Sequence, residues 1–290
     1  MADTMKANVF DPIVWGDMAQ AEFKTRAVVA TTDAVMTADT LAGQPGSTIR
    51  FPRFAALADM TNIAENASIV PETLSQEASE ATIKEAAKGV AYTDLADLAG
   101  LGDIETEAVR QFGVLAARKV DADLIAAATA TVTGGITVQG GTARDSAPIS
   151  HALNGATLTW SGIVDALEKF GDDFEPSEFS GLFIRAEQRS QIMKDDTFIH
   201  ASELQAGGDG SIVGRGFIGE VAGLPVYVTN RLDAKNFLIL KKNSLGLLYK
   251  RRPQVERDRD ILARKNIVTI NMHYAVKRLT DTGVLVGSLK

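Results

Sequence analysis

The chain of 290 residues contains no cysteine and only three histidines. The missing thiols exclude disulfides, thiol catalysis and thiolate metal sites. His151, His200 and His273 stand far apart, and none has a second ligand at helical spacing, so we expect no metal site. No serine lies in a Gly-x-Ser-x-Gly elbow, so the sequence gives no support for a catalytic Ser-His-Asp triad. The sequence therefore predicts no cofactor, no metal and no enzymatic activity.

Long apolar runs are missing as well. No stretch approaches the ~20 apolar residues that a membrane helix needs. The first residues also lack the basic start and apolar core of a signal peptide. With 45% hydrophobic residues, the chain can bury a core in one large or two medium domains. We expect a globular protein that folds in a cytoplasm and does not bind a membrane.

One glycine-rich string has the spacing of a nucleotide-binding motif. Residues 214–219 match the dinucleotide pattern Gly-x-Gly-x-x-Gly, whose mechanism needs a helix directly after the glycines. Gly223 and Pro225 prevent such a helix, and the strand-like residues 226–229 follow. The string therefore predicts a loop before a strand and no cofactor.

Positive charge is scarce over most of the chain. Residues 241–290 carry 12 Lys and Arg against 4 Asp and Glu, a net charge of +8, whereas the first 240 residues carry −15. The contrast is sharpest in residues 55–83, which hold five acidic residues and no Lys or Arg. An acidic and a basic segment in one chain can pair within a subunit or between neighbours, or each can simply be solvated.

The acidic segment lies inside a predicted hairpin. Residues 47–54 read as an edge strand, because Pro52 cannot donate to a ladder, and residues 81–93 read as the returning strand. The tip between them, of about 25 residues, is far longer than common loops. It has few large apolar residues and cannot fold on itself, so we expect a partner to support it.

A long helix is the clearest element of the sequence. Asp103 is a good N-cap for a helix from Ile104 to about Thr131. Its apolar residues recur at spacings of three and four and give one buried stripe: Ile104, Ala108, Phe112, Leu115, Ala116, Val120 and Leu124. Beyond it, helices at 160–170 and 186–194 flank a buried strand at 180–185, and residues 216–289 read as short strands.

The order of these parts resembles the major capsid proteins of tailed bacteriophages with the Hong Kong 97-type fold. The closest stretches are residues 46–54 (GSTIRFPRF), 218–226 (IGEVAGLPV) and 255–260 (VERDRD), with Tyr274 and residues 283–286 (GVLV) beyond them. The resemblance implies an α+β fold with these parts: N-terminal arm 1–45, E-loop hairpin 46–93, peripheral domain with spine helix 94–131, axial domain 132–240, and a return to the peripheral domain with terminal strands at 241–290.

The resemblance also implies the function. Copies of the chain would self-assemble as pentamers and hexamers into an icosahedral shell around double-stranded DNA, in the host cytoplasm and then in the virion. Portal, scaffolding and decoration proteins are the implied partners, together with non-specific contact to the packaged DNA. Because residues 55–83 contain no lysine, the covalent crosslinking of some family members is not expected.

We expect three groups of residues to form contacts between subunits. Apolar side chains of the arm and the hairpin would be buried on neighbours, and acidic residues of the hairpin would meet basic residues of the next copy. The apolar group is Phe10, Trp15, Phe54 and Ile69; the acidic group is Glu65, Glu72 and Glu77; the basic group is Arg251, Arg252, Arg257 and Arg264.

Two other functions stay open at the level of sequence. An encapsulin-like nanocompartment shares the fold and encloses a cargo enzyme instead of DNA. A soluble enzyme with an α/β core would need convergent polar residues, which the sequence does not offer.

Overall fold

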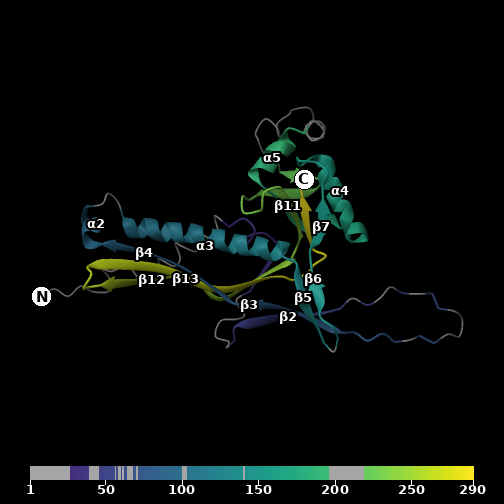
Figure 1. Ribbon diagram of the computed structural model, residues 1–290, viewed down its shortest axis with the longest axis horizontal. Coiled ribbons are helices and arrows are strands. Elements are labelled where there is room, and N and C mark those ends of the chain that lie inside the picture. Colours follow the sequence, from purple (N-terminus) through teal and green to yellow (C-terminus); the bar gives the residue numbers. More distant parts are fainter. Residues whose placement is uncertain are drawn as a thin grey trace.

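The computed structural model describes residues 27–38, 46–55, 57, 60, 62–63, 68–69, 71–99, 103–139, 141–195 and 219–290. Its described residues form an elongated body built on a long helix, a second body beside one end of that helix, and a hairpin that projects past both (Figure 1). The strands fall into three sheets, one for each of these parts.

The elongated body is one long helix on a sheet of four strands. In the order β1-β12-β13-β4, the strands are Val35–Ala38, Leu245–Asp260, Lys265–Arg278 and Lys84–Thr93. The pairing of β1 with β12 is parallel, and the other two pairings are antiparallel. Helix α3, Ile104–Thr129, packs along this sheet (Figure 1), and the short helix α2, Asp94–Ala99, follows β4.

The prediction of the long helix is confirmed. The Asp103 side chain accepts hydrogen bonds from the N–H groups of Glu105 and Thr106, which satisfies two of the free donors at the start of α3. The predicted stripe from Ala108 to Leu124 is buried against the sheet, with one exception. Leu115 is 40% exposed and lies beside a groove instead of in the core.

The second body is a six-stranded sheet with helices around it. In the order β7-β14-β11-β8-β10-β9, the strands are Ile149–Ala152, Val284–Ser288, Asn236–Lys241, Phe179–Ile184, Leu224–Val228 and Glu220–Val221. Helices α4, Trp160–Leu167, and α5, Ala186–Met193, accompany the sheet, with 3-10 turns at Glu168–Asp173 and Pro176–Glu178. The strand predicted at 180–185 is the fully buried β8, and the body has its own hydrophobic core.

The last strand corrects a sequence-based expectation. Residues 241–290 were expected to return to the sheet beside the spine helix, and β12 and β13 do so. However, β14 lies between β7 and β11 in the six-stranded sheet. Gly287 fits there because a β-carbon at that position would lie 2.0 Å from the ring of the buried Phe237.

The hairpin also differs from the prediction. Its four-stranded sheet has the order β2-β3-β5-β6, with strands Thr48–Phe54, Gln76–Thr82, Val132–Val138 and Arg144–Ser146. The strand that returns from the tip is therefore β3, whereas most of the predicted return strand is β4, which pairs with β13 in the other sheet. The prediction was wrong because β3 (QEASEAT) lacks large apolar residues and gives no hydrophobic strand pattern.

Candidate inter-subunit surfaces

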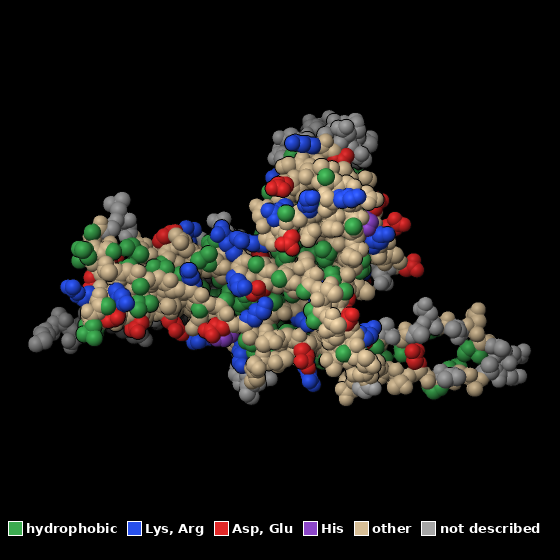
Figure 2. Space-filling model, in the orientation of Figure 1, with side chains coloured by type: hydrophobic (Ala, Val, Ile, Leu, Met, Phe, Trp, Pro, Cys, Tyr) green, Lys and Arg blue, Asp and Glu red, His purple; other side chains and the backbone are tan. Residues whose placement is uncertain are grey.

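The hairpin tip, defined as residues 55–75, exposes large apolar side chains. Phe54, which ends β2, is 62% exposed, and Ile69 within the tip is 76% exposed. Four further side chains of the tip are at least half exposed: Leu57, Met60, Ile63 and Leu74. The described part of the tip extends away from both bodies (Figures 1 and 2). Such a row of exposed apolar residues indicates a contact surface for another molecule.

The base of the hairpin contains a buried carboxylate, Glu77, for which we predicted from the sequence a contact with another subunit. Glu77 is only 3% exposed. Its Oε2 atom accepts hydrogen bonds from Arg53 Nε at 3.2 Å and from Arg144 Nη2 at 2.7 Å. Both partners belong to the same chain, so the expectation that Glu77 meets an arginine of another subunit is wrong. A buried carboxylate needs such partners because it has lost its hydration.

The same cluster reaches the end of α3. Arg278 is buried, and its Nη1 atom donates to the carbonyl oxygens of Ala128 and Ala130 at 2.8 and 2.7 Å. These carbonyls have no partner within the helix, and the cation also favours the negative end of the helix dipole. Arg278 Nε donates to Asp281 at 2.7 Å, and Arg53 Nη1 donates to the carbonyl oxygen of Leu279 at 3.0 Å.

We call this cluster the root network, because it joins the root of the hairpin to the body. Its members are Arg53, Glu77, Arg144, Ser146, Arg278 and Asp281. Ser146 completes it, because its hydroxyl oxygen accepts from Arg278 Nη2 at 2.9 Å and its hydroxyl group donates to Asp281 at 2.8 Å. One polar cluster thus connects the hairpin, α3 and the end of β13.

The predicted basic residues lie on β12 and in the turn after it. Arg251 Nη2 lies 3.3 Å from Glu256, and Arg257 Nη1 lies 3.3 Å from Glu105 on α3. The guanidinium group of Arg252 lies 5.7 Å from the ring centroid of Tyr249. Arg264, in the β12–β13 turn, accepts a hydrogen bond at its carbonyl oxygen from the Asp94 N–H group. The basic segment is thus partly compensated within its own chain, and its contact with a neighbour stays a prediction.

A second exposed apolar surface lies at the far end of the elongated body (Figure 2). We call it the distal end; it consists of Leu95 and Leu98 on α2 and Ile261 and Leu262 in the β12–β13 turn, each at least 75% exposed. Arg259 Nη2 donates to Asp94 Oδ2 at 2.9 Å, which holds the turn beside α2. Sequence reasoning missed this surface, although leucines three residues apart in a helix with no buried residue are a signal for it.

Some predicted positions lie outside the described residues: Phe10, Trp15, Glu65, His200 and the glycines 214 and 216. After Gly219 the chain forms β9 and β10, as predicted, and not the helix that a dinucleotide site requires. Among the residues that the structure describes, no group of three His, Asp or Glu side chains could hold a metal ion. Nor is any described helix long and apolar enough to cross a membrane.

Comparison with known proteins identifies the family to which this chain belongs. A family model described as phage capsid protein matches residues 76–286. The major capsid protein of Staphylococcus phage phiMR11 is 34% identical over 281 residues, which cover 93% of this chain and 90% of that protein. The chain therefore belongs to the phage capsid protein family, which confirms the resemblance drawn from its sequence.

Solved structures show the same mixed fold of helices and sheets. A chain of the cyanophage P-SCSP1u capsid has a TM-score of 0.69 at 15% identity, and the match covers 91% of this chain and 89% of that one. A chain of the cyanophage Pam1 capsid has a TM-score of 0.68 at 16% identity, with 92% and 91% covered. A virus-like particle from Pyrococcus furiosus also shares the fold, with a TM-score of 0.60, 11% identity, and 95% and 98% covered.

Proposed function

We propose that this chain is a major capsid protein whose copies close into an icosahedral shell around double-stranded phage DNA. The observation that carries the proposal is the hairpin tip, which exposes six large apolar side chains, counting Phe54, and in which none of the described residues is buried. Full burial of one such side chain stabilises a contact by about 1.5–3 kcal/mol. Because every subunit both gives and receives a tip, these contacts multiply around a closed shell.

We assign the parts of the Hong Kong 97-type fold as follows. The hairpin of β2 and β3 is the E-loop, α3 with its four-stranded sheet is the peripheral domain, and the six-stranded sheet is the axial domain. Compared with the boundaries expected from sequence, β5 and β6 belong to the sheet of the hairpin, and β14 belongs to the axial domain. Residues 1–45 remain the proposed N-terminal arm.

The role that we propose is structural and not catalytic. Pentamers and hexamers of the chain would meet the portal, and scaffolding or decoration proteins where the phage has them, and would contact packaged DNA without sequence preference. Subunits would collect in the host cytoplasm before they become part of the virion capsid. Of the acidic residues predicted to contact a neighbour, Glu65 and Glu72 remain in the proposal and Glu77 is removed from it.

Replacement of residues 57–74 by a short Gly-Ser turn tests the proposal. We expect the unmodified chain to form shells visible by negative-stain electron microscopy, and the shortened chain to stay a folded, soluble subunit. The control is Val164→Ser, which removes an exposed apolar side chain from α4 and should leave shell formation unchanged. Shells formed equally well without the tip, or no shells from the unmodified chain, would contradict the proposal.

The alternative that the sequence left open is a nanocompartment that encloses protein cargo. The contents of shells purified from a natural infection separate the two functions. Double-stranded DNA of genome length inside the shell is the expected result, whereas a single enclosed enzyme would favour the nanocompartment.

A further inference from the structure

A polar cavity with a volume of about 470 Å³ lies at the junction of the two bodies. Its lining comes from three segments: the 3-10 turn Pro176–Glu178, the end of β11 with the connection from β11 to β12, and the connection from β13 to β14. Each of these connections joins a strand of the six-stranded sheet to a strand of the four-stranded sheet beside α3. Side chains from both bodies therefore meet around the cavity.

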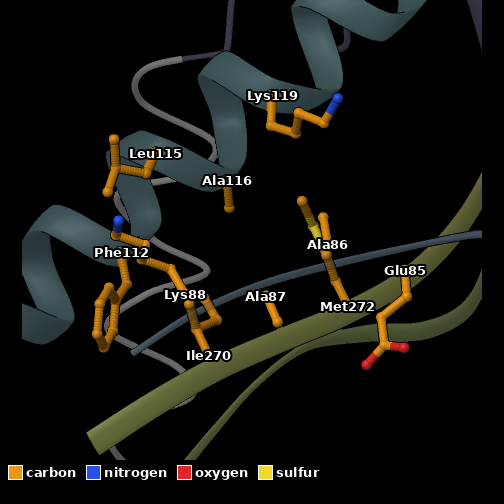
Figure 3. A pocket seen from close by; sticks show the side chains of 10 residues that line it. All are labelled: Glu85, Ala86, Ala87, Lys88, Phe112, Leu115, Ala116, Lys119, Ile270 and Met272. Atoms are coloured by element: carbon orange, nitrogen blue, oxygen red, sulfur yellow. The ribbon is translucent and has the colours of Figure 1, made fainter. Parts of the chain in front are cut away.

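Most side chains around the cavity can donate a hydrogen bond. They are the hydroxyl groups of Ser177, Ser244, Thr280 and Thr282 and the ammonium groups of Lys241 and Lys242, beside the carboxylate of Glu178. The hollow between α3 and β4 is different, because apolar side chains such as Leu115 and Met272 form most of its wall (Figure 3). A wall of hydroxyl and ammonium groups indicates a place for an anion with several oxygen acceptors.

One of these donors is buried without a partner. Ser244 is 1% exposed, and its Oγ atom has no hydrogen-bond partner among the described residues. Buried polar groups are normally hydrogen-bonded, because an unpaired one has lost its hydration without compensation. The Ser244 hydroxyl group therefore has a free donor in a residue that lines the cavity.

Gly283 keeps space free beside Ser244. A β-carbon at Gly283 would lie 3.1 Å from the β-carbon of Ser244, 3.5 Å from that of Thr280 and 3.6 Å from that of Lys241. Three side chains thus converge on one point, and a side chain at position 283 would crowd all of them. Without it, the lining can turn its donors toward a ligand.

The positive charge of the lining is only partly neutralised. Lys241 Nζ lies 3.0 Å from Glu178 Oε2 and 5.4 Å from the ring centroid of Phe179, so its ammonium group is held in place. Lys242 is exposed and has no ion pair among the described residues. Two lysines against one glutamate leave a net charge of +1 on the lining, which favours an anion.

We propose that this cavity binds a phosphate group, with Lys242, Ser244 and Thr280 among its donors. Because the donors come from three segments, they suit a tetrahedral oxyanion better than a planar carboxylate. The cavity is large enough for a phosphate group that belongs to a larger molecule. The ligand is therefore either free phosphate or a phosphodiester of nucleic acid, and the inference does not depend on the proposed function.

Titration of the full-length chain with inorganic phosphate at constant ionic strength tests the site, with calorimetry as the readout. The unmodified chain should bind phosphate. Ser244→Ala and Lys242→Gln should each weaken the affinity about tenfold or more, the usual effect of removing a hydrogen bond to a charged group. Glu178→Gln should strengthen it, because a carboxylate beside the bound anion is removed.

Two matched controls should bind phosphate as the unmodified chain does. Ser180→Ala removes another buried hydroxyl group that has no described partner, but Ser180 does not line the cavity. Lys88→Gln removes an exposed lysine that lines the other hollow (Figure 3). Without phosphate, Ser244→Ala should unfold at the same or a higher denaturant concentration than the unmodified chain, whereas loss of a merely structural hydrogen bond would lower it.

A short DNA duplex identifies the source of the phosphate group. If Ser244→Ala weakens duplex binding as well, measured by fluorescence anisotropy, the cavity receives a phosphodiester; if it weakens only the binding of inorganic phosphate, the ligand is free phosphate. The inference is overturned if the unmodified chain binds neither ligand, or if Ser244→Ala and Lys242→Gln leave both affinities unchanged. Either result leaves the proposed shell function intact.

Discussion

At the scale of residues, a buried tyrosine and aspartate join α3 to its sheet. The Tyr274 hydroxyl group on β13 donates to Asp123 Oδ2 on α3 at 2.6 Å. Burial by itself would raise the pKa of Asp123, but the hydrogen bonds from Tyr274 and Lys119 hold it below its usual value. Burial and the charge of Asp123 raise the pKa of Tyr274, so the hydroxyl group keeps its proton and remains a donor.

We predict that Tyr274→Phe destabilises the subunit by about 1.5–3 kcal/mol, the usual contribution of a hydrogen bond to a charged group. In the unmodified subunit, the stabilisation from Asp123 is present above its unfolded pKa and is lost as the pH falls through its lower folded pKa. Without the tyrosine hydroxyl group the folded pKa rises, so the loss begins at higher pH. Denaturant unfolding of the dissociated subunit between pH 3 and 7 measures both effects.

Tyr227→Phe is the control, because Tyr227 contributes a ring stacked on Phe183 and its hydroxyl group has no described partner. It should leave the pH dependence unchanged. The same pH dependence in Tyr274→Phe and the unmodified chain would show that Asp123 does not depend on this donor.

At the scale of elements, the root network fixes the direction in which the hairpin leaves the body. Arg53 makes one of the connections, because it contacts Glu77 within the hairpin and the carbonyl oxygen of Leu279 in the body. We predict that Arg53→Ala leaves the fold intact but increases hydrogen exchange of the β2 and β3 amides at least several-fold, since buried Glu77 loses a partner. Mass spectrometry of exchanged peptides measures this.

Arg50→Ala is the matched control. Arg50 pairs with Glu80 across the same two strands, but both side chains are exposed, and such surface pairs contribute little. If the two variants increased exchange equally, the root network would not be what holds the hairpin.

The elements differ in how far the sequence predicts them. Helix α3 was predicted almost to the residue, because a cap at Asp103 and a regular apolar period are local signals. The polar strand β3 was missed, because its stability comes from β2, from β5 and from the ion pairs of Glu77, which are contacts distant in sequence. The same limit applies to β14, whose apolar residues predict a strand but not the sheet that it joins.

The candidate contact surfaces also differ in how far the sequence predicts them. The hairpin tip was predicted because its length, its acidity and its exposed Phe54 and Ile69 can be read from the chain. The distal end was not, because it arises where α2 and the β12–β13 turn, which are distant in sequence, meet. Glu77 was assigned to a contact between subunits because a single sequence does not show that Arg53 and Arg144 already neutralise it.

At the scale of the whole molecule, both bodies are completed by the C-terminal part of the chain. β14 fills the position between β7 and β11, so its removal would divide the six-stranded sheet and open its core. We predict that a chain ending at Gly283 does not fold to a soluble subunit, whereas Lys290→Ala behaves as the unmodified chain. Solubility and circular dichroism measure the outcome, and a soluble, cooperatively unfolding truncated chain would contradict it.

The position of β14 also has a consequence for the order in which the strands can pair during folding. β1 pairs with β12, which lies more than 200 residues later in the sequence, and β7 pairs with the late strand β14. Pairings of such long separation form slowly. The early strands β1 and β7 therefore stay unpaired in their sheets until β12 and β14 have been made. The order of the strands thus makes both sheets depend on long-range pairing, so neither can form from the first half of the chain alone.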